Sequence, residues 1–374
     1  MKQVNIFLFW ASISLIFFLS CKETSSELSL AGEWQFALDP EDAGVGQEWQ
    51  NKDLGDVVRL PGSLQEQGKG EDVSLDTRWT GQVVDSSWYN APEYAKYRQP
   101  GNIKVPFWLN PDKHYVGAAW YQKKVNVPSG WENRPVVLYL ERTHWATTLY
   151  MDDQNSLQTP HRFVLDGLQA GEHTITLRVD NRLYVDVGMN AHSVSDHTQS
   201  NWNGIIGDIK LSAKPSRYIE SVQIYPDIKK KQATLKIRLA GNAGKDNSTI
   251  SLQAETASGN PVGEFVQVEV DAKNSDNCIE ATVDMGEEIK TWSEHTPNVY
   301  RMNVLLQSPD GVDRKACDFG FREFKANGTR FEVNGQPVFL RGTLECCIFP
   351  LTGYPAMQND YWAKIYRICK EYGL

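Results

Sequence analysis

The chain has 374 residues, enough for two or three domains, and 41 % of them are hydrophobic, as in ordinary globular proteins. Its formal net charge is −9 at pH 7, its isoelectric point is near 5.4, and no block of basic residues stands out. Because phosphate recognition requires a surface rich in Lys and Arg, these values argue against a nucleic-acid partner and favour a neutral ligand.

The first 21 residues have the pattern of an export signal. Lys2 precedes an apolar run over residues 6–19, which is too short to span a bilayer as a mature helix. Ser20-Cys21 then resembles a bacterial lipobox, with Phe18 where Leu is usual. We therefore expect residues 1–21 to be a lipoprotein signal peptide and Cys21 to be lipidated. The protein would be exported to the periplasm or outer membrane, with the lipid as its only membrane contact. Ordinary signal cleavage next to an incidental cysteine is the alternative.

Residues 28–213 have the pattern of a jelly-roll β-sandwich. Short runs of alternating apolar and polar residues are separated by Gly and Pro turns, without a convincing helical run. The clearest strand spans 173–181. Its apolar side chains are predicted to share one face and its polar ones the other: Ile175, Leu177 and Val179 against Thr174, Thr176, Arg178 and Asp180.

A long irregular insertion, roughly 61–115, interrupts this domain and is rich in aromatic residues. Insertions of this length are usually functional or fold on their own side chains. Two interpretations stay open, namely platforms for sugar rings or a self-packed loop over one sheet. The aromatic residues are Trp79, Trp88, Tyr89, Tyr94, Tyr97, Phe107, Trp108 and Tyr115.

Residues 214–324 carry about seven further short strands, which predicts an immunoglobulin-like sandwich acting as a spacer. Five cysteines follow Cys21, and none of their spacings is typical of a metal site. Cys278 and Cys317 could form a bridge in an oxidising compartment, or all five could be free thiols.

The pattern changes again in residues 325–374. The segment "FEVNGQPVFLRG" predicts a hairpin, because Asn334-Gly335 tolerates the positive φ angles of a tight turn. The apolar stretch at 338–342 is typical of a parallel strand buried on both faces. A loop follows, and then a helix with Asp360 as the expected cap and Gly373 as the expected end.

Five phrases together resemble family 2 glycoside hydrolases of the β-galactosidase and β-glucuronidase class, in the order of that family's domains. They are "WYQKKVNVP" (120–128), "ITLRVDN" (175–181), "NWNGIIGDIKL" (201–211), "WSEHTPNVYRMNV" (292–304) and "FGFREFKANGTRFEVNGQPVFLRG" (319–342). The resemblance implies a sugar-binding jelly roll, an immunoglobulin-like domain and, from residue 325, the first strand and helix of a truncated (β/α)₈ barrel.

The family's chemistry implies hydrolysis of a β-linked glycoside by two glutamates, held about 5–5.5 Å apart in retaining enzymes. In the family both glutamates lie on later barrel strands, so we assign no catalytic residue here and expect this chain to be inactive alone. The resemblance implies no cofactor. The text "TLECCIFPLTGYP" after Arg341-Gly342 departs from the N-x-H-E motif of well-known β-galactosidases. A non-catalytic carbohydrate-binding surface lipoprotein and a scaffold without sugar contact are the alternatives.

Candidate sugar-binding residues come from two places. In the family, a loop near the jelly roll's closing motif contacts the substrate, which here suggests Asp196, His197, Asn201 and Trp202. The alternative is that these side chains form a network that only holds the loop in place. At the end of the predicted barrel strand, Arg341 and Glu345 would line a pocket, or Arg341 would be a structural ion-pair partner. We assign no metal site, because His192, Asp196 and His197 lack further ligands at a suitable spacing.

Overall fold

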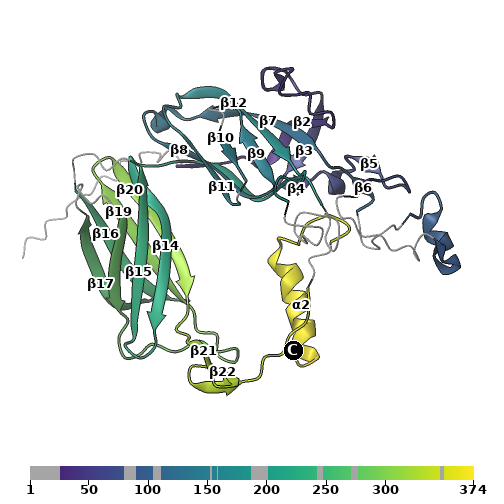
Figure 1. Ribbon diagram of the computed structural model, residues 1–374. Coiled ribbons are helices and arrows are strands. Elements are labelled where there is room, and N and C mark those ends of the chain that lie inside the picture. The colour runs from purple at the N-terminus through teal and green to yellow at the C-terminus, as the bar shows by residue number, and fades with distance from the viewer. Residues whose placement is uncertain are drawn as a thin grey trace, which may run out of the picture.

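The computed structural model describes residues 26–79, 90–103, 111–151, 154–157, 159–186, 201–241, 247–270, 277–345 and 349–374. The predicted signal peptide and Cys21 lie outside these ranges. Two β-sandwiches are followed by a small three-stranded sheet and a helix (Figure 1). The predicted mainly β fold with two sandwiches is therefore confirmed.

The first sandwich packs a five-stranded sheet against a six-stranded one, with antiparallel pairing throughout. The five-stranded sheet contains β1 (Glu27–Ser29), β13 (Gly204–Ala213), β8 (Val136–His144) and β11 (His161–Leu165), with β4 (Gly62–Ser63) beside β13. The six-stranded sheet contains β10 (Gln154–Ser156), β9 (Ala146–Leu149), β12 (Gly171–Asp180), β7 (Ala118–Val127), β2 (Gly32–Asp39) and β3 (Asp56–Leu60).

Side-chain alternation places the core between these sheets. On β12, Ile175, Leu177 and Val179 are buried in the sandwich, as the sequence predicts. The strand pairs with β7 over ten residues, so both strands present their apolar faces in register. Full burial of such a side chain contributes about 1.5–3 kcal/mol.

The insertion folds in part on itself. It contains the short pair β5 (Glu71–Asp72) and β6 (Lys113–His114), and the 3₁₀ turns η2 (Gln65–Gln67) and η3 (Pro92–Arg98). Tyr115 is buried, and the ring of Trp79 meets that of His114 edge-on at 4.9 Å. These contacts favour the self-packed interpretation for the described part. Trp88, Tyr89, Phe107 and Trp108 lie outside the described residues.

The first sandwich also carries the 3₁₀ turns η1 (Trp49–Asn51) and η4 (Ser129–Trp131).

The second sandwich has seven strands among the described residues and its own hydrophobic core. One sheet contains β14 (Arg217–Asp227), β15 (Gln232–Gly241) and β18 (Cys278–Asp284). The other contains β17 (Pro261–Val270), β16 (Ser248–Thr256), β19 (Tyr300–Ser308) and β20 (Gly311–Phe319). Cys278 and Cys317 lie on different sheets and are free thiols in this structure.

The predicted hairpin is present after the second sandwich. Strands β21 (Phe324–Asn327), β22 (Arg330–Val333) and β23 (Gln336–Val338) form an antiparallel sheet. Asn334 and Gly335 have φ angles of 52° and 78°, as the tight turn requires.

Two local predictions in the C-terminal segment are wrong. Residues 339–343 do not form a buried strand, and the side chains of Phe339 and Leu340 are 86 % and 59 % exposed. A parallel strand needs neighbours on both edges and cover on both faces, and no described strand pairs with this stretch. Helix α2 (Asn359–Glu371) has Gln358 at its N-cap instead of Asp360. Gly373, with a φ of 79°, follows its end. Among the described helices, none is long and apolar enough to cross a membrane.

Candidate functional site

The predicted residues Asn201 and Trp202 are buried at the base of the loop that carries Asp196 and His197. Trp202 is 7 % exposed, and its indole ring stacks on the His144 ring with centroids 5.1 Å apart. The His144 imidazole Nδ1 lies 2.6 Å from the Trp202 carbonyl oxygen. Asp196 and His197 lie outside the described residues, so their part in sugar binding stays a prediction.

Two buried asparagines connect this base to the sheet. Asn181 Nδ2 donates to the carbonyls of Tyr115 at 2.8 Å and Trp202 at 3.3 Å. Asn203 Nδ2 donates to the carbonyl of Val179 at 3.1 Å, and its Oδ1 accepts the Tyr121 hydroxyl at 2.8 Å. Because buried polar groups require partners, these amides hold both ends of the loop at one place on the sandwich.

The C-terminal segment docks against the same place. The Tyr354 hydroxyl donates to the Glu66 carboxylate at 3.0 Å, and the Ser63 hydroxyl donates to the Thr352 carbonyl. Burial and the Glu66 carboxylate raise the pKa of Tyr354 above its usual range. At Gly353, where φ is 83°, an added Cβ would lie 3.0 Å from the Cβ of Trp202. Residues 352–354 therefore sit directly on the base of the loop.

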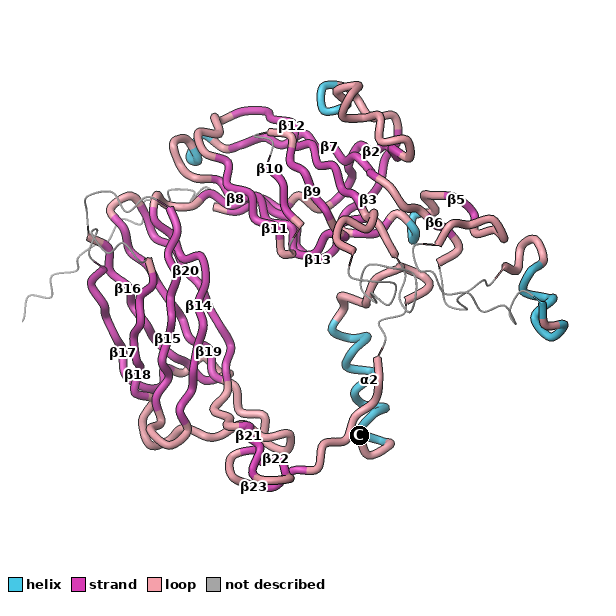
Figure 2. The backbone as a smooth tube through the Cα atoms, in the orientation of Figure 1, coloured by secondary structure: helices cyan, strands magenta, loops and turns pink. Residues whose placement is uncertain are grey.

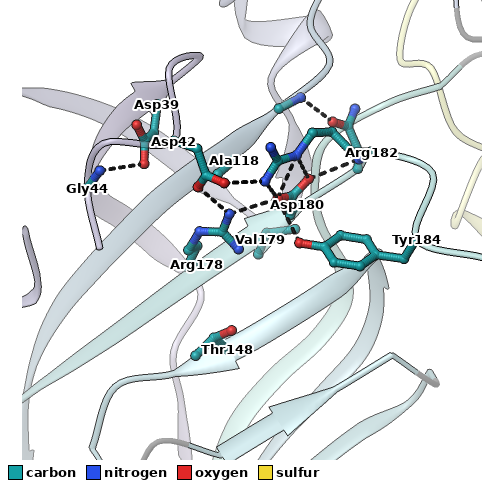
Figure 3. Close-up of polar contacts among 12 residues, drawn as sticks. Asp39, Asp42, Gly44, Ala118, Thr148, Arg178, Val179, Asp180, Arg182 and Tyr184 are labelled. Carbon is teal, nitrogen blue, oxygen red and sulfur yellow. Dashed lines mark hydrogen bonds and ion pairs between the residues drawn. The ribbon is translucent and has the colours of Figure 1, made fainter. Parts of the chain in front are cut away.

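A network of charged side chains lies beside the start of the loop (Figure 3). Arg178 Nη2 contacts Asp42 at 2.6 Å and Asp180 at 2.8 Å, and Arg182 Nη2 contacts Asp42 at 2.7 Å. The Tyr184 hydroxyl donates to Asp180 at 2.9 Å. Two arginines thus surround two carboxylates, of which Asp180 is fully buried.

The arginines of this network lower the pKa values of both of its carboxylates. Burial alone would raise the pKa of Asp180, but hydrogen bonds from Arg182 and Tyr184 outweigh it and hold the pKa below its usual range. The pKa of Asp42 is lowered in the same way, against burial, by Arg182 and Arg178. A general acid needs a proton to give, so neither carboxylate is suited to that role. The network instead orients the chain as it leaves β12.

Sequence reasoning missed this network and the docking contacts. The signal for the first was the run of charges at alternate positions in Arg178, Asp180 and Arg182, of which the first two lie on one face of β12 and the third follows the strand's end. The fourth member, Asp42, is 136 residues from Arg178, and no local pattern connects them.

Of the two remaining predicted residues, Arg341 and Glu345, the structure places Arg341 away from Trp202. Both side chains are exposed, and Arg341 lies near Gly373, beyond the end of α2. Tyr354 precedes the first residue of α2 by five positions, whereas Arg341 lies beside Gly373 after its last residue, and the 13 residues of the helix span about 20 Å. Arg341 lines a pocket of 560 Å³ with Trp292, Arg322 and Lys370. The sugar-binding role of Arg341 and Glu345 stays a prediction. Within the described ranges, no group of three His, Cys, Asp or Glu side chains could hold a metal ion.

Comparison with solved structures gives the fold a context. The β-glucuronidase from Ruminococcus gnavus in complex with D-glucaro-d-lactam superposes with a TM-score of 0.61 at 16 % identity, over 92 % of this chain and 53 % of that one. Its complex with uronic isofagomine gives 0.56 at 16 % identity, over 84 % and 47 %. The apo form at 1.7 Å resolution gives 0.57 at 16 % identity, over 84 % and 49 %. The chain spans about half the length of these structures, and at this identity they establish a shared fold.

Family comparison covers both sandwiches. Residues 28–215 match the sugar binding domain of glycosyl hydrolases family 2, and residues 217–322 match a second domain described as glycosyl hydrolases family 2. The two matches follow one another in the order in which the structure places the two sandwiches. The chain therefore belongs to glycosyl hydrolases family 2.

Proposed function

We propose that this protein contributes the sugar-binding, spacer and barrel-entry portions of an exported enzyme that hydrolyses β-linked glycosides. The carrying observation is the docking of residues 352–354 on Trp202, at the base of the loop that holds Asp196 and His197. This contact joins the proposed barrel entry to Trp202, which follows the proposed glycan-recognition loop in the sequence. A retaining mechanism would then use two glutamates from later barrel strands, one as acid and one as nucleophile.

The substrate class is proposed from two observations. The segment after Arg341-Gly342 departs from the motif of well-known β-galactosidases, which speaks against a simple galactoside. The Ruminococcus gnavus structures are β-glucuronidases, several of them in complex with uronic compounds. We therefore propose β-glucuronides as the first substrates to test and β-galactosides as the second.

For the 374-residue chain by itself, we propose glycan binding without turnover. The binding test compares Asp196→Ala with Asp166→Ala, an exposed aspartate in the turn between β11 and β12, by titrating oligosaccharides identified on a glycan array. The Asp196 variant should weaken binding about tenfold through a lost charge-assisted hydrogen bond, and the control should not. Equal affinities in both variants would contradict the proposed recognition loop.

The hydrolysis test uses 4-nitrophenyl β-glycosides with the same preparation. We expect no release of nitrophenolate by this chain, and measurable turnover would show that it carries its own catalytic pair. A carbohydrate-binding surface lipoprotein is the competing function. The competing function predicts that no polypeptide added to this chain produces hydrolysis, whereas the proposed one predicts hydrolysis once a matching barrel portion is present.

The lipid anchor at Cys21 is a separate proposal. It rests on the apolar run and the Ser20-Cys21 pair. Wild type and Cys21→Ser would be compared after labelling with radioactive palmitate and membrane fractionation. Label in the wild type and its loss in the variant are expected, and equal label in both would exclude this anchor.

A further inference from the structure

A cleft of 370 Å³ lies between the two sandwiches, on the side of the five-stranded sheet. Figure 2 shows the backbones of the two sandwiches that contribute its walls. Its walls come from β8, β11 and β13 of the first sandwich and from β14 and β20 of the second. Its volume falls within the range of small-molecule sites, which often occur at domain junctions. On β8, Tyr139 of the cleft and His144 of the loop base are five residues apart, about 17 Å.

The carboxylates of this cleft are already paired. Four of them line it, and each lies within 4.0 Å of a basic nitrogen. The pairs are Glu27–Lys210 at 3.3 Å, Asp208–Lys210 at 3.8 Å, Asp313–Lys214 at 3.0 Å and Glu220–Arg238 at 3.8 Å. Asp313 also accepts the backbone N–H of Ile219 at 2.8 Å. These groups therefore have little capacity left for another cation.

Three cations of the same lining have no carboxylate partner. Among the described residues, Arg162, Arg314 and Lys315 form no ion pair within 4.0 Å. Lys315 is half-buried, and its Nζ donates to the Glu220 carbonyl at 2.9 Å, which holds it in place. Burial, together with the positive charges of Arg162 and Lys214, lowers the pKa of Lys315. The cleft thus holds unbalanced positive charge in a protein whose net charge is −9.

An aromatic ring completes the surface. The Arg162 guanidinium carbon lies 5.3 Å from the centre of the Tyr139 ring, and Lys210 Nζ lies 5.9 Å from it. Tyr218 and Val164 also line the cleft. Flat apolar side chains beside fixed cations suit a ring that carries an anionic substituent.

We propose that this cleft is an accessory binding site for an acidic saccharide that carries carboxylate or sulfate groups. The anionic character follows from the charges, and the saccharide part rests on the proposed function. Arg162 belongs to the first sandwich and Lys315 to the second, so the bound ligand bridges them. Trp202, at the base of the recognition loop, does not line this cleft.

Calorimetric titration of the purified full chain tests this site. The probes are a tetrasaccharide with alternating glucuronate, its carboxyl-reduced neutral form, and that neutral form after sulfation. The two acidic probes should bind at least about tenfold more tightly than the neutral one, and their affinity should fall with added salt. Equal binding of all three probes, or binding of none, would overturn the proposal.

Variants locate the binding. Arg162→Gln and Lys315→Gln should each weaken acidic binding about tenfold, whereas Arg162→Lys, which keeps the charge, should retain most of it. Lys124→Gln is the control, because Lys124 is 65 % exposed on the other sheet. If Asp196→Ala abolishes binding and Arg162→Gln does not, the ligand occupies the recognition loop. That outcome overturns the cleft and leaves the proposed function intact.

Discussion

The two sandwiches and the C-terminal segment differ in how far they bury their apolar side chains. Each sandwich surrounds its own core, with residues such as Trp34, Leu177 and Leu252 at most 1 % exposed. Among the described residues of the segment 324–374, Tyr354 is the only buried apolar side chain, and helix α2 buries none. The described part of the segment exposes eleven large apolar residues, namely Phe324, Phe331, Phe339, Leu340, Leu344, Leu351, Tyr361, Tyr366, Ile368, Tyr372 and Leu374.

The difference shows what each architecture requires. An antiparallel sandwich finds hydrogen-bond partners and a facing sheet within its own sequence, so its core closes locally. A strand followed by a helix must be covered by further elements, and here it contacts the rest of the chain chiefly at the Tyr354–Trp202 anchor. The predictions below test this contrast.

The largest contrast is expected from two Leu→Ala substitutions. Leu177→Ala, in the first core, should lower the free energy of unfolding by about 2–5 kcal/mol, because it removes buried methyl groups and leaves a cavity. Leu344→Ala, at a side chain that is 85 % exposed, should change it by less than about 0.5 kcal/mol. Urea titrations of both variants measure this, and similar losses would mean that the C-terminal segment also belongs to a core.

The charged network should matter far more than a surface ion pair of the same kind. Arg178→Gln leaves the buried Asp180 with less compensation and should cost about 3 kcal/mol. The matched control, Arg301→Gln, breaks the exposed pair with Asp318 and should leave stability almost unchanged, because solvent screens that pair. Thermal unfolding followed by circular dichroism measures both, and an equally mild effect at Arg178 would refute the assigned structural role.

The first sandwich should lose stability in mild acid through His161. Its side chain is fully buried, and burial lowers its pKa to about 4 from an ordinary value near 6.5. Above pH 6.5 the imidazole is neutral in both the folded and the unfolded state. As the pH decreases from 6.5 to 4, the unfolded chain takes up the proton before the folded chain does. The free energy of unfolding therefore decreases over this range, and the total loss, reached below pH 4, is at most about 3 kcal/mol. Comparing wild type with His161→Gln isolates this slope from that of the carboxylates; identical slopes would contradict the assignment.

The smallest effect is expected at the anchor. Tyr354→Phe removes the hydrogen bond to Glu66 and should cost about 1 kcal/mol locally, with little change in global stability. Hydrogen exchange of residues 349–357 should become faster. Tyr361→Phe, at a side chain that is 43 % exposed, is the control and should leave that exchange unchanged. Unchanged exchange in Tyr354→Phe would show that packing of Trp202 alone holds the segment.

Much of the fold follows from local patterns in the sequence. On β12, Ile175, Leu177 and Val179 lie in the hydrophobic core as predicted, although the polar residues of the other face, Thr176, Arg178 and Asp180, are buried as well. The hairpin at Asn334-Gly335 forms because only those two residues must accept positive φ. Such features depend on periods of two residues or on single turns, and each can be recognised within about ten residues.

Prediction failed where a strand depended on pairing partners outside its own segment, and where a helix start depended on a difference of two positions. The apolar run at 339–343 is suitable for a barrel strand, but it has no strand partner among the described residues and stays exposed. Asp360 and Gln358 differ by two positions, and helix ends are poorly determined by composition.

By itself, the sequence determined the family, the succession of two β-sandwiches and the separation of core from surface on individual strands. Tertiary structure alone decided that Trp202 is covered by Tyr354, that Asp42 completes the arginine network, and that unpaired cations from both sandwiches converge on one cleft. The reason is distance along the chain. Alternation reports a residue's immediate neighbours, whereas these contacts join side chains at least 136 residues apart, and only the packing of finished sheets brings them together.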